Sequence, residues 1–226
     1  MEYVAAFREK RYTKKEALDA EIARTKRMYL FEEKYSDFPY VCGIDEVGRG
    51  PLAGPVCAGA VILPKDKFIL YLNDSKQLTE KKREKLYDVI REHALAYATA
   101  FVSGARIDEI NILQATYEAM AMAVRSLEET YRIRPDALLI DAVHVPQLEA
   151  YKQVSIVKGD AQCASIAAAS ILAKVDRDRL MAGFDAQYPG YGFISHKGYG
   201  TAAHIEAIRT KGPSPIHRRT FITRLV

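Results

Sequence analysis

The sequence has no apolar stretch near the roughly 20 residues that a membrane-spanning helix needs, and its first residues contain no apolar signal-peptide core. It is also poor in cysteine. Cys42, Cys57 and Cys163 are odd in number, have apolar neighbours and match no zinc-binding spacing, so we expect three free, buried thiols. These absences argue against a membrane protein and a disulfide-rich secreted domain. They predict a cytoplasmic protein in a reducing compartment.

What is present is an ordinary globular composition with a mild excess of basic residues. The 226 residues are 49% hydrophobic, and 33 Lys and Arg against 29 Asp and Glu give a net charge of +4. From Asp176 onward the chain has eight Lys and Arg against four Asp and Glu. A basic end on a balanced chain is typical of nucleic-acid binding, but a merely solvated surface explains this feature equally well.

Two parts of the chain differ in their residue patterns. Residues 1–38 are charged, contain no glycine and show helical spacing of apolar residues, so we expect an N-terminal charged helical segment there. Residues 39–226 form the second part. Strands are predicted over 40–46, 56–63, 97–104, 136–142 and 153–160, and helices after Thr79, after Asn111 and over 162–181 and 201–211. This order predicts an α/β fold with a mixed central sheet and flanking helices. The Ala-rich first half of 162–181 should let that helix approach the sheet closely.

Carboxylates end three of the predicted strands. Asp45 and Glu46 close the first, Asp141 closes the fourth and Asp160 closes the fifth. Neighbours on a strand point to opposite faces, so Asp45 and Glu46 converge only if the chain turns there, and Gly48 and Gly50 supply a turn.

Each of these acids taken alone is expected to be a solvated loop residue. If they converge, each pair about 5 Å apart repels by roughly 3 kcal/mol at an effective dielectric of 20. Hard divalent cations with oxygen ligands relieve that repulsion, and two such ions clamp the attacking and leaving oxygens of a phosphodiester. A basic chain with this cluster therefore suggests a nuclease.

Two nucleotide-binding readings are rejected. GRGPLA (48–53) fits a dinucleotide fingerprint, but Pro51, Gly54 and Pro55 lead into a strand, whereas that fingerprint must open a helix. A GxxxxGK[ST] loop is absent from the sequence.

Seven ordered motifs over residues 40–226 resemble the ribonuclease HII family, the type 2 ribonucleases H. They are DEVGRGPLAGPV (45–56), NDSKQL (73–78), LLIDA (138–142), KGD (158–160), SIAAASILAKVDRDRLM (165–181), HKGYGT (196–201) and HRRTF (217–221). The resemblance implies a ribonuclease H-like fold with a C-terminal helical extension. It also implies Mg²⁺ or Mn²⁺ bound by Asp45, Glu46, Asp141 and Asp160, which would be the catalytic residues.

The same resemblance implies the substrate and its contacts. Family members cut on the 5′ side of ribonucleotides in RNA–DNA hybrids and in duplex DNA with embedded ribonucleotides, leaving 3′-hydroxyl and 5′-phosphate ends. The residues implied in substrate binding are Gly48, Arg49, Gly50, Tyr199, Ser75, Lys76, Lys158 and Ser165. A monomer is expected, with no membrane partner.

Some residues and alternatives fall outside these assignments. Asp176 and Asp178 alternate with Arg177 and Arg179 inside a helix, and we interpret them as an ion-paired face. Ala142-Val143 stands where many relatives have Gly-Asn. The alternatives are a ribonuclease HIII-like hybrid-cleaving enzyme, a histidine-based ribonuclease using acid–base pairs, and a non-catalytic nucleic-acid-binding module.

Overall fold

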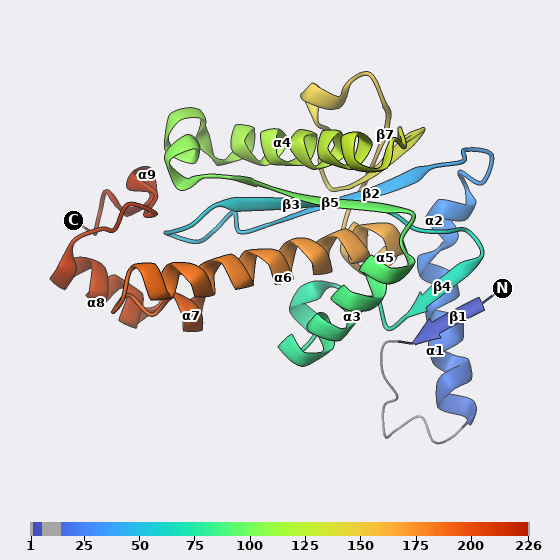
Figure 1. Ribbon diagram of the computed structural model, residues 1–226, viewed down its shortest axis with the longest axis horizontal. Helices are drawn as coiled ribbons and strands as arrows, with labels where there is room; N and C mark the ends of the chain where they lie inside the picture. The colour runs from blue at the N-terminus through green and yellow to red at the C-terminus, as the bar shows by residue number, and fades with distance from the viewer. Residues whose placement is uncertain (1, 6–14, 226) are drawn as a thin grey trace.

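A five-stranded mixed sheet lies at the centre of the molecule (Figure 1). The computed structural model describes residues 2–5 and 15–225. In spatial order the strands of the sheet are β5 (Ala96–Val102), β3 (Val56–Ile62), β2 (Val41–Val47), β6 (Ala137–Asp141) and β7 (Lys152–Ile156). β3 runs antiparallel to β2 and β5, whereas β2, β6 and β7 are parallel to one another. The predicted mixed-sheet α/β fold is confirmed.

Helices cover both faces of this sheet. α4 (Gly104–Tyr131) lies along one face, and α6 (Ala164–Gln187) with α3 (Glu80–His93) lies along the other (Figure 1). Alternate residues of β2 and β3 face the two sides, so each side has its own buried apolar cluster. β2, at the middle of the sheet, is buried on both faces.

The backbone of α6 touches the sheet where two strand glycines face it. A methyl group built on Gly43 would lie 2.2 Å from the backbone carbon of Ser165, and one built on Gly59 would lie 2.4 Å from the carbonyl oxygen of Ala169. Any side chain at either strand position would push the helix away. The close approach expected of the Ala-rich helix is confirmed.

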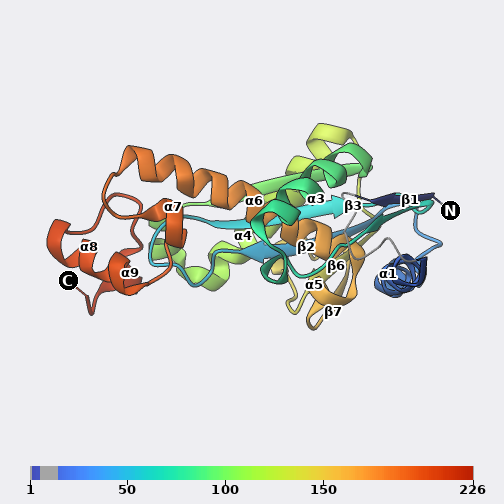
Figure 2. The ribbon, with the colours of Figure 1, turned by 90° about the horizontal axis from the view of Figure 1, so that it is seen from below.

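The C-terminal part of the chain extends beyond the end of the sheet. α7 (Phe193–His196), α8 (Ala202–Lys211) and α9 (Arg219–Ile222) gather at the far end of α6 (Figures 1 and 2). A bridge between Ala53 and His217 joins this extension to the loop after β2.

The N-terminal helices pack against the opposite end of the molecule. α1 (Lys15–Met28) and α2 (Leu30–Glu33) confirm the helices expected in this segment, and residues 6–14 lie outside the described residues. Met28 and Tyr29 are buried in the same cluster as residues of α3 and α6. The division of the chain at residue 38 stays a prediction.

Two short parallel strands beside α1 were not predicted. β1 (Glu2–Ala5) pairs with β4 (Lys67–Leu70) in a sheet separate from the central one. Each strand has four residues, too few for period-two alternation to be distinguished from chance.

Three predicted boundaries were wrong, including the end of the helix predicted over 162–181, which continues to Gln187 as α6. α4 starts at Gly104, capped by Ser103, and the predicted start at Asn111 is an internal kink where φ is +67°. The Asn111 side chain still accepts hydrogen bonds from the backbone N–H groups of Leu113 and Gln114, as a helix cap does. The strand predicted over 153–160 ends at Ile156.

The expectations about cysteine and hydrophobic runs can also be compared with the structure. Cys42, Cys57 and Cys163 are free and buried, as predicted. Within the described residues, no helix is both long and apolar enough to cross a membrane.

Candidate active site

Asp45 and Asp141 lie side by side because β2 and β6 are parallel neighbours. The register pairs Ile44 with Ile140, so the next residue on each strand is an aspartate on the α6 side of the sheet. Asp45 is only 4% exposed. Asp141 accepts a hydrogen bond of 2.7 Å from the backbone N–H of Gly159, which ties the segment after β7 to this edge.

Glu46 does not follow a turn, contrary to the expectation from Gly48 and Gly50. β2 continues to Val47 because its pairing with β3 continues to Val47 and Cys57. Strand alternation therefore starts the Glu46 side chain away from Asp45, but its carboxylate stays close enough for the charges of Asp141 and Lys76 to act on it. The turn comes after the strand, and Arg49 within it approaches Glu46, with Nη1 3.5 Å from Oε1.

Asp160 reaches the site from a short helix, not from a strand end. It lies in α5 (Gly159–Gln162), which begins after Lys158 adopts the left-handed conformation. The Asp160 carboxylate lies 3.9 Å from Nζ of Lys76.

Burial and mutual repulsion disfavour charge on these acids. The pKa of Asp45 is raised well above its usual range by burial and then by the charges of Glu46 and Asp141. Burial also raises the pKa of Glu46, although Arg49 opposes this shift. For Asp160, burial and the charges of Asp74 and Asp141 raise the pKa. The site thus concentrates negative charge that nearby lysine and arginine only partly offset.

The chemistry of these side chains fits a hard divalent cation, since all four are carboxylates. In residues 2–5 and 15–225, however, no three His, Cys, Asp or Glu side chains converge closely enough to hold an ion between them. The acids are neighbours around Asp141 and are not arranged as a finished ligand cage.

The glycine loop after β2 meets Tyr199 of the C-terminal extension. Gly48 has φ of +89°, and a methyl group built on it would lie 2.2 Å from Nε of Arg177, so only glycine fits there. A methyl group on Gly50 would lie 3.9 Å from Cε1 of Tyr199. Tyr199 is 40% exposed beside this loop, open to a bound molecule.

Arg177 donates hydrogen bonds to the loop from the buried side of α6. The sequence pattern did not predict this role. We expected it on an ion-paired face, and that was wrong, because Arg177 is completely buried. It donates to the carbonyls of Pro55, Ala53 and Lys197 at 2.9, 3.3 and 3.0 Å. Its spacing of four from Ala173 and Met181, both apolar, was the available signal for an inward-facing position.

Arg218 holds the same loop from the C-terminal extension. It is also completely buried and donates to the carbonyls of Gly48, Arg49 and Gly54 at 2.5, 2.7 and 2.9 Å. Burial, with the charge of Arg177, lowers the pKa of Arg218 to about 9. Two buried guanidinium groups thus fix the carbonyls on the inner side of the loop.

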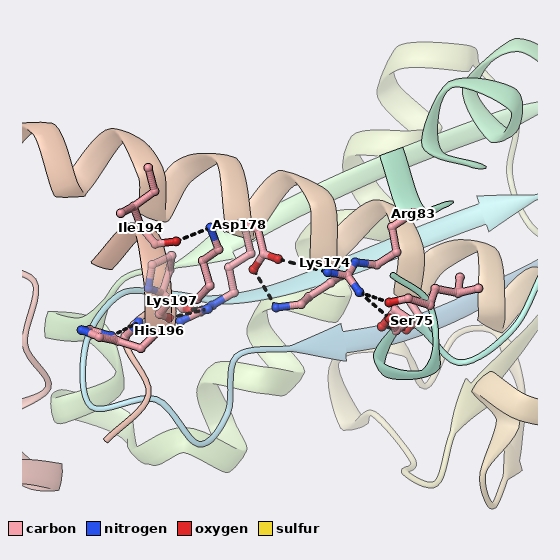
Figure 3. Close-up of polar contacts among 12 residues, drawn as sticks. Ser75, Arg83, Lys174, Asp178, Ile194, His196 and Lys197 are labelled. Carbon is pink, nitrogen blue, oxygen red and sulfur yellow. Dashed lines mark hydrogen bonds and ion pairs between the residues drawn. The ribbon is translucent and has the colours of Figure 1, made fainter. Parts of the chain in front are cut away.

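Of the two acids next to Arg177 on α6, Asp178 is ion-paired as predicted, whereas Asp176 accepts from hydroxyl groups. Asp178 accepts a 2.7 Å hydrogen bond from Lys174 and lies 3.8 Å from Arg83 (Figure 3). Asp176 accepts hydrogen bonds of 2.7 Å from the hydroxyl groups of Tyr87 and Thr99. Both acids are therefore satisfied by structural partners.

The 73–78 segment presents Lys76 outward and Ser75 inward. Arg83 donates to the carbonyl of Ser75 (Figure 3). It also donates to the carbonyl of Leu78. Ser75 is 2% exposed, and its hydroxyl accepts from Ser170 at 2.8 Å. The Lys76 side chain is 73% exposed.

Ser165 and Lys158 also differ in exposure, with the lysine outward and the serine inward. Lys158 is exposed just before Asp160. Ser165 is fully buried, and its backbone N–H and hydroxyl both donate to Oε1 of Glu32, at 2.7 and 2.8 Å. The side chains of Ser165 and Ser75 are thus placed to support the backbone, not to contact a ligand directly.

A family model described as Ribonuclease HII matches residues 42–224 of this chain. The chain belongs to the ribonuclease HII family. A ribonuclease HII from Lachnoclostridium phytofermentans is 59% identical over 217 residues, which cover 96% of this chain and 82% of the relative. One from Caldanaerobacter subterraneus is 49% identical over 211 residues, covering 92% and 86%. As a ribonuclease HII, the protein is an endoribonuclease.

Solved structures agree with this assignment. Ribonuclease H2 from Pyrococcus horikoshii has a TM-score of 0.66 and 28% identity, covering 82% of this chain and 96% of that one. A ribonuclease HIII in complex with Mn²⁺ shares the fold with a TM-score of 0.61 at 19% identity, covering 76% of this chain and 63% of that one. The ribonuclease H-like fold is confirmed, and the family match favours ribonuclease HII over the ribonuclease HIII alternative.

Proposed function

We propose that this protein is a metal-dependent endonuclease that cuts on the 5′ side of ribonucleotides, in RNA–DNA hybrids and in duplex DNA with embedded ribonucleotides. The products are 3′-hydroxyl and 5′-phosphate ends. The observation that carries the proposal is the adjacent pair Asp45 and Asp141, of which Asp45 is buried, together with a glycine loop that Arg218 holds and that meets Tyr199. We expect the enzyme to act as a cytoplasmic monomer.

Asp45, Glu46, Asp141 and Asp160 would hold Mg²⁺ or Mn²⁺, which when bound supplies activation of water and neutralisation of charge on the phosphate. Burial and mutual repulsion raise the pKa of Asp45 and Asp160. This supports the assignment, because the positive charge of a divalent cation would favour the ionised carboxylates.

Ribose recognition is assigned to the loop of Gly48, Arg49 and Gly50 with Tyr199. Only the 2′-hydroxyl distinguishes RNA from DNA at a single nucleotide. The inner carbonyls of the loop are occupied by Arg218, so its outer polar groups are held ready for a ligand. The partly exposed Tyr199 ring borders the same place and can stack on a sugar or base.

Phosphate contacts are assigned to Lys76 and Lys158, the exposed cations next to Asp160. A cleft of about 820 Å³ lies between the N-terminal helices, Asn73 and Gln77, and α5, where Ala161 and Gln162 line it. Arg27 and Lys34 line it and are exposed. We assign this cleft to the substrate backbone beyond the cut site, which would give the N-terminal segment a role in grip.

The test is cleavage of a labelled DNA duplex that carries one ribonucleotide, with Mg²⁺ or Mn²⁺ and with EDTA. We expect a single cut 5′ to the ribonucleotide, lost with EDTA and in Asp141→Asn. Products with 2′,3′-cyclic phosphate ends and activity in EDTA would instead indicate histidine-based chemistry. Absence of cleavage by the folded wild-type protein, with duplex binding retained, would support a binding module.

A further inference from the structure

Three histidine side chains pack together beneath Tyr199 in the C-terminal extension. The rings of His196 and His204 stack with centroids 4.3 Å apart, and those of His204 and His217 are 5.2 Å apart. His204 and His217 are 0% and 2% exposed. Neither reaches the surface, so neither is placed to act on a substrate.

The hydrogen bonds of this cluster determine which nitrogen of His217 carries the proton. The backbone N–H of Ser214 points at Nδ1 of His217 at 2.9 Å. A backbone N–H can only donate, so Nδ1 of His217 is the unprotonated acceptor, and the Ser214 hydroxyl, 2.8 Å from the same nitrogen, donates to it as well. In a neutral ring the proton is then on Nε2.

That assignment fixes His204 in turn. Nε2 of His217 and Nε2 of His204 are 3.0 Å apart, so the protonated His217 nitrogen donates and the His204 nitrogen accepts. The proton of neutral His204 is therefore on Nδ1, which lies 2.9 Å from the carbonyl oxygen of Tyr199. A carbonyl can only accept, so the assignment made from Ser214 agrees with the one required by the Tyr199 carbonyl. All the hydrogen bonds between them therefore run in one direction.

His196 completes the support of the same segment. The backbone N–H of Gly198 donates to Nδ1 of His196 at 3.2 Å, so Nε2 carries its proton and donates to the Tyr191 carbonyl at 2.8 Å. The neighbouring Gly198 carbonyl accepts from the backbone N–H of Leu52 at 2.8 Å. The residue before Tyr199 is thereby tied to the loop after β2.

We infer that His204 and His217 are positioning residues, whose one-directional hydrogen-bond chain from Ser214 to the Tyr199 carbonyl sets Tyr199 for ribose recognition. The inference rests on the proposed function of Tyr199. Burial lowers the pKa of both histidines, which keeps the rings neutral at neutral pH as the chain requires. A proton added to His204 would put two N–H groups against each other at Nε2.

The wild-type protein gives the first test, without any cleavage. ¹⁵N spectra of histidine side chains distinguish the two neutral forms. We expect His204 to carry its proton on Nδ1, the less common form of free histidine, and His217 on Nε2. A proton on Nε2 of His204 at neutral pH would overturn the proposal.

A matched pair of variants gives the second test. Asparagine and leucine have nearly the same shape, but His204→Asn keeps a donor near the Nδ1 position and His204→Leu does not. Loss of one hydrogen bond should make kcat/KM of His204→Leu on a duplex with a single ribonucleotide about fivefold lower than that of His204→Asn. On a long RNA–DNA hybrid, where many registers are available, the two variants should differ less.

Two outcomes of the variant test are kept distinct. If wild type does not cut the single ribonucleotide, the proposed function fails, whereas the ¹⁵N result still stands. If wild type cuts it and the two variants have equal kcat/KM on both substrates, the positioning role is overturned. Melting temperatures show whether either variant has lost its fold.

Discussion

The negative charge of Asp45 destabilises the folded state. The residue is buried beside Asp141, and burial with the charges of its neighbours raises its pKa. In the absence of metal, Asp45→Asn removes repulsion of roughly 3 kcal/mol for a pair about 5 Å apart at a dielectric of 20. We expect the metal-free melting temperature to hold or rise by several degrees, and cleavage to be abolished.

Asp178 provides the control for that experiment. It is also a partly buried aspartate, but its neighbours are Lys174 and Arg83. Asp178→Asn should therefore lower the melting temperature and leave the chemistry in place. A fall of similar size in both variants would contradict the repulsion argument, and turnover near wild type in Asp45→Asn would contradict the metal assignment.

Tyr199 is predicted to act through its ring and its hydroxyl group. Tyr199→Phe loses one neutral hydrogen bond, about 1 kcal/mol or fivefold in kcat/KM. Tyr199→Ala also loses the ring, and stacking adds about 1–3 kcal/mol. The measurement is kcat/KM at fixed salt on a single-ribonucleotide duplex and on a long hybrid, with the larger loss expected on the former. Equal losses on both would make Tyr199 a structural residue.

Arg218 is predicted to be irreplaceable by lysine. Its planar group donates to three carbonyls of the glycine loop, and a lysine ammonium group cannot reproduce that fork. Arg218→Lys should lower both the melting temperature and kcat/KM on the single-ribonucleotide duplex. Arg219→Lys, at an exposed neighbouring position, is the control and should change neither.

Among the elements of the fold, α6 is capped by a residue from far away in the sequence. Its N-cap residue, Cys163, makes no side-chain cap, and Glu32 of α2 accepts from the Ser165 N–H instead. Glu32→Ala should destabilise the protein by about 1–2 kcal/mol, measured by denaturant unfolding. Glu33→Ala, at an exposed neighbouring position, should be nearly neutral. An unchanged free energy of unfolding in Glu32→Ala would show that water replaces the cap.

This contact also bears on the role of the N-terminal segment. Deleting residues 1–38 would remove the Glu32 cap together with Met28 and Tyr29, which are buried in the core. We therefore expect loss of stability from that deletion, so its effect on activity does not by itself report on substrate grip.

The elements that the sequence predicted are those with strong local signals. β2, β3 and β6 are long apolar runs, and α3 starts at the predicted Thr79 cap. The inward position of Arg177 was signalled by its spacing, but its bonds to Pro55, those of Arg218 to the glycine loop and the Glu32 cap could not be predicted, because these partners lie more than 100 residues away in the chain. The candidate acids were found because strand ends gather at one edge. The directions of their side chains depend on the residue at which strand pairing ends, and the spacing of residues in the sequence does not reveal that residue.

For the whole molecule, pH acts on stability in two opposite directions. Burial and the neighbouring His204 lower the pKa of His217 to about 4, with Arg219 and His196 adding to the shift. The unfolded chain then binds a proton near pH 6.5 that the folded chain takes up only near 4, so stability falls as pH falls through this range. For the raised pKa of Asp45 the sign is reversed, and acidification favours the folded state.

The His217 contribution can be isolated with a variant. Asparagine can accept the Ser214 N–H at the same position but does not titrate, so His217→Asn should lose less stability on acidification than wild type does. The difference should grow to about 3 kcal/mol between pH 6.5 and 4, at 1.36 kcal/mol per pH unit. Denaturant unfolding at several pH values measures it, and parallel curves for the two proteins would show that His217 is not the titrating group.

The strand order gives this enzyme a particular course during synthesis. β2, β3 and β5 can pair as soon as they leave the ribosome, but β2 can pair with β6 only later. The start of β6 is fixed by a hydrogen bond between the Tyr40 N–H and the Asp136 side chain, 96 residues apart. Until β6 pairs, the central strand has an open edge, the kind of surface that invites pairing with other chains. The same delay keeps Asp45 apart from Asp141. The pairing of β6 with β2 therefore closes this edge in the same step that brings the two candidate aspartates together.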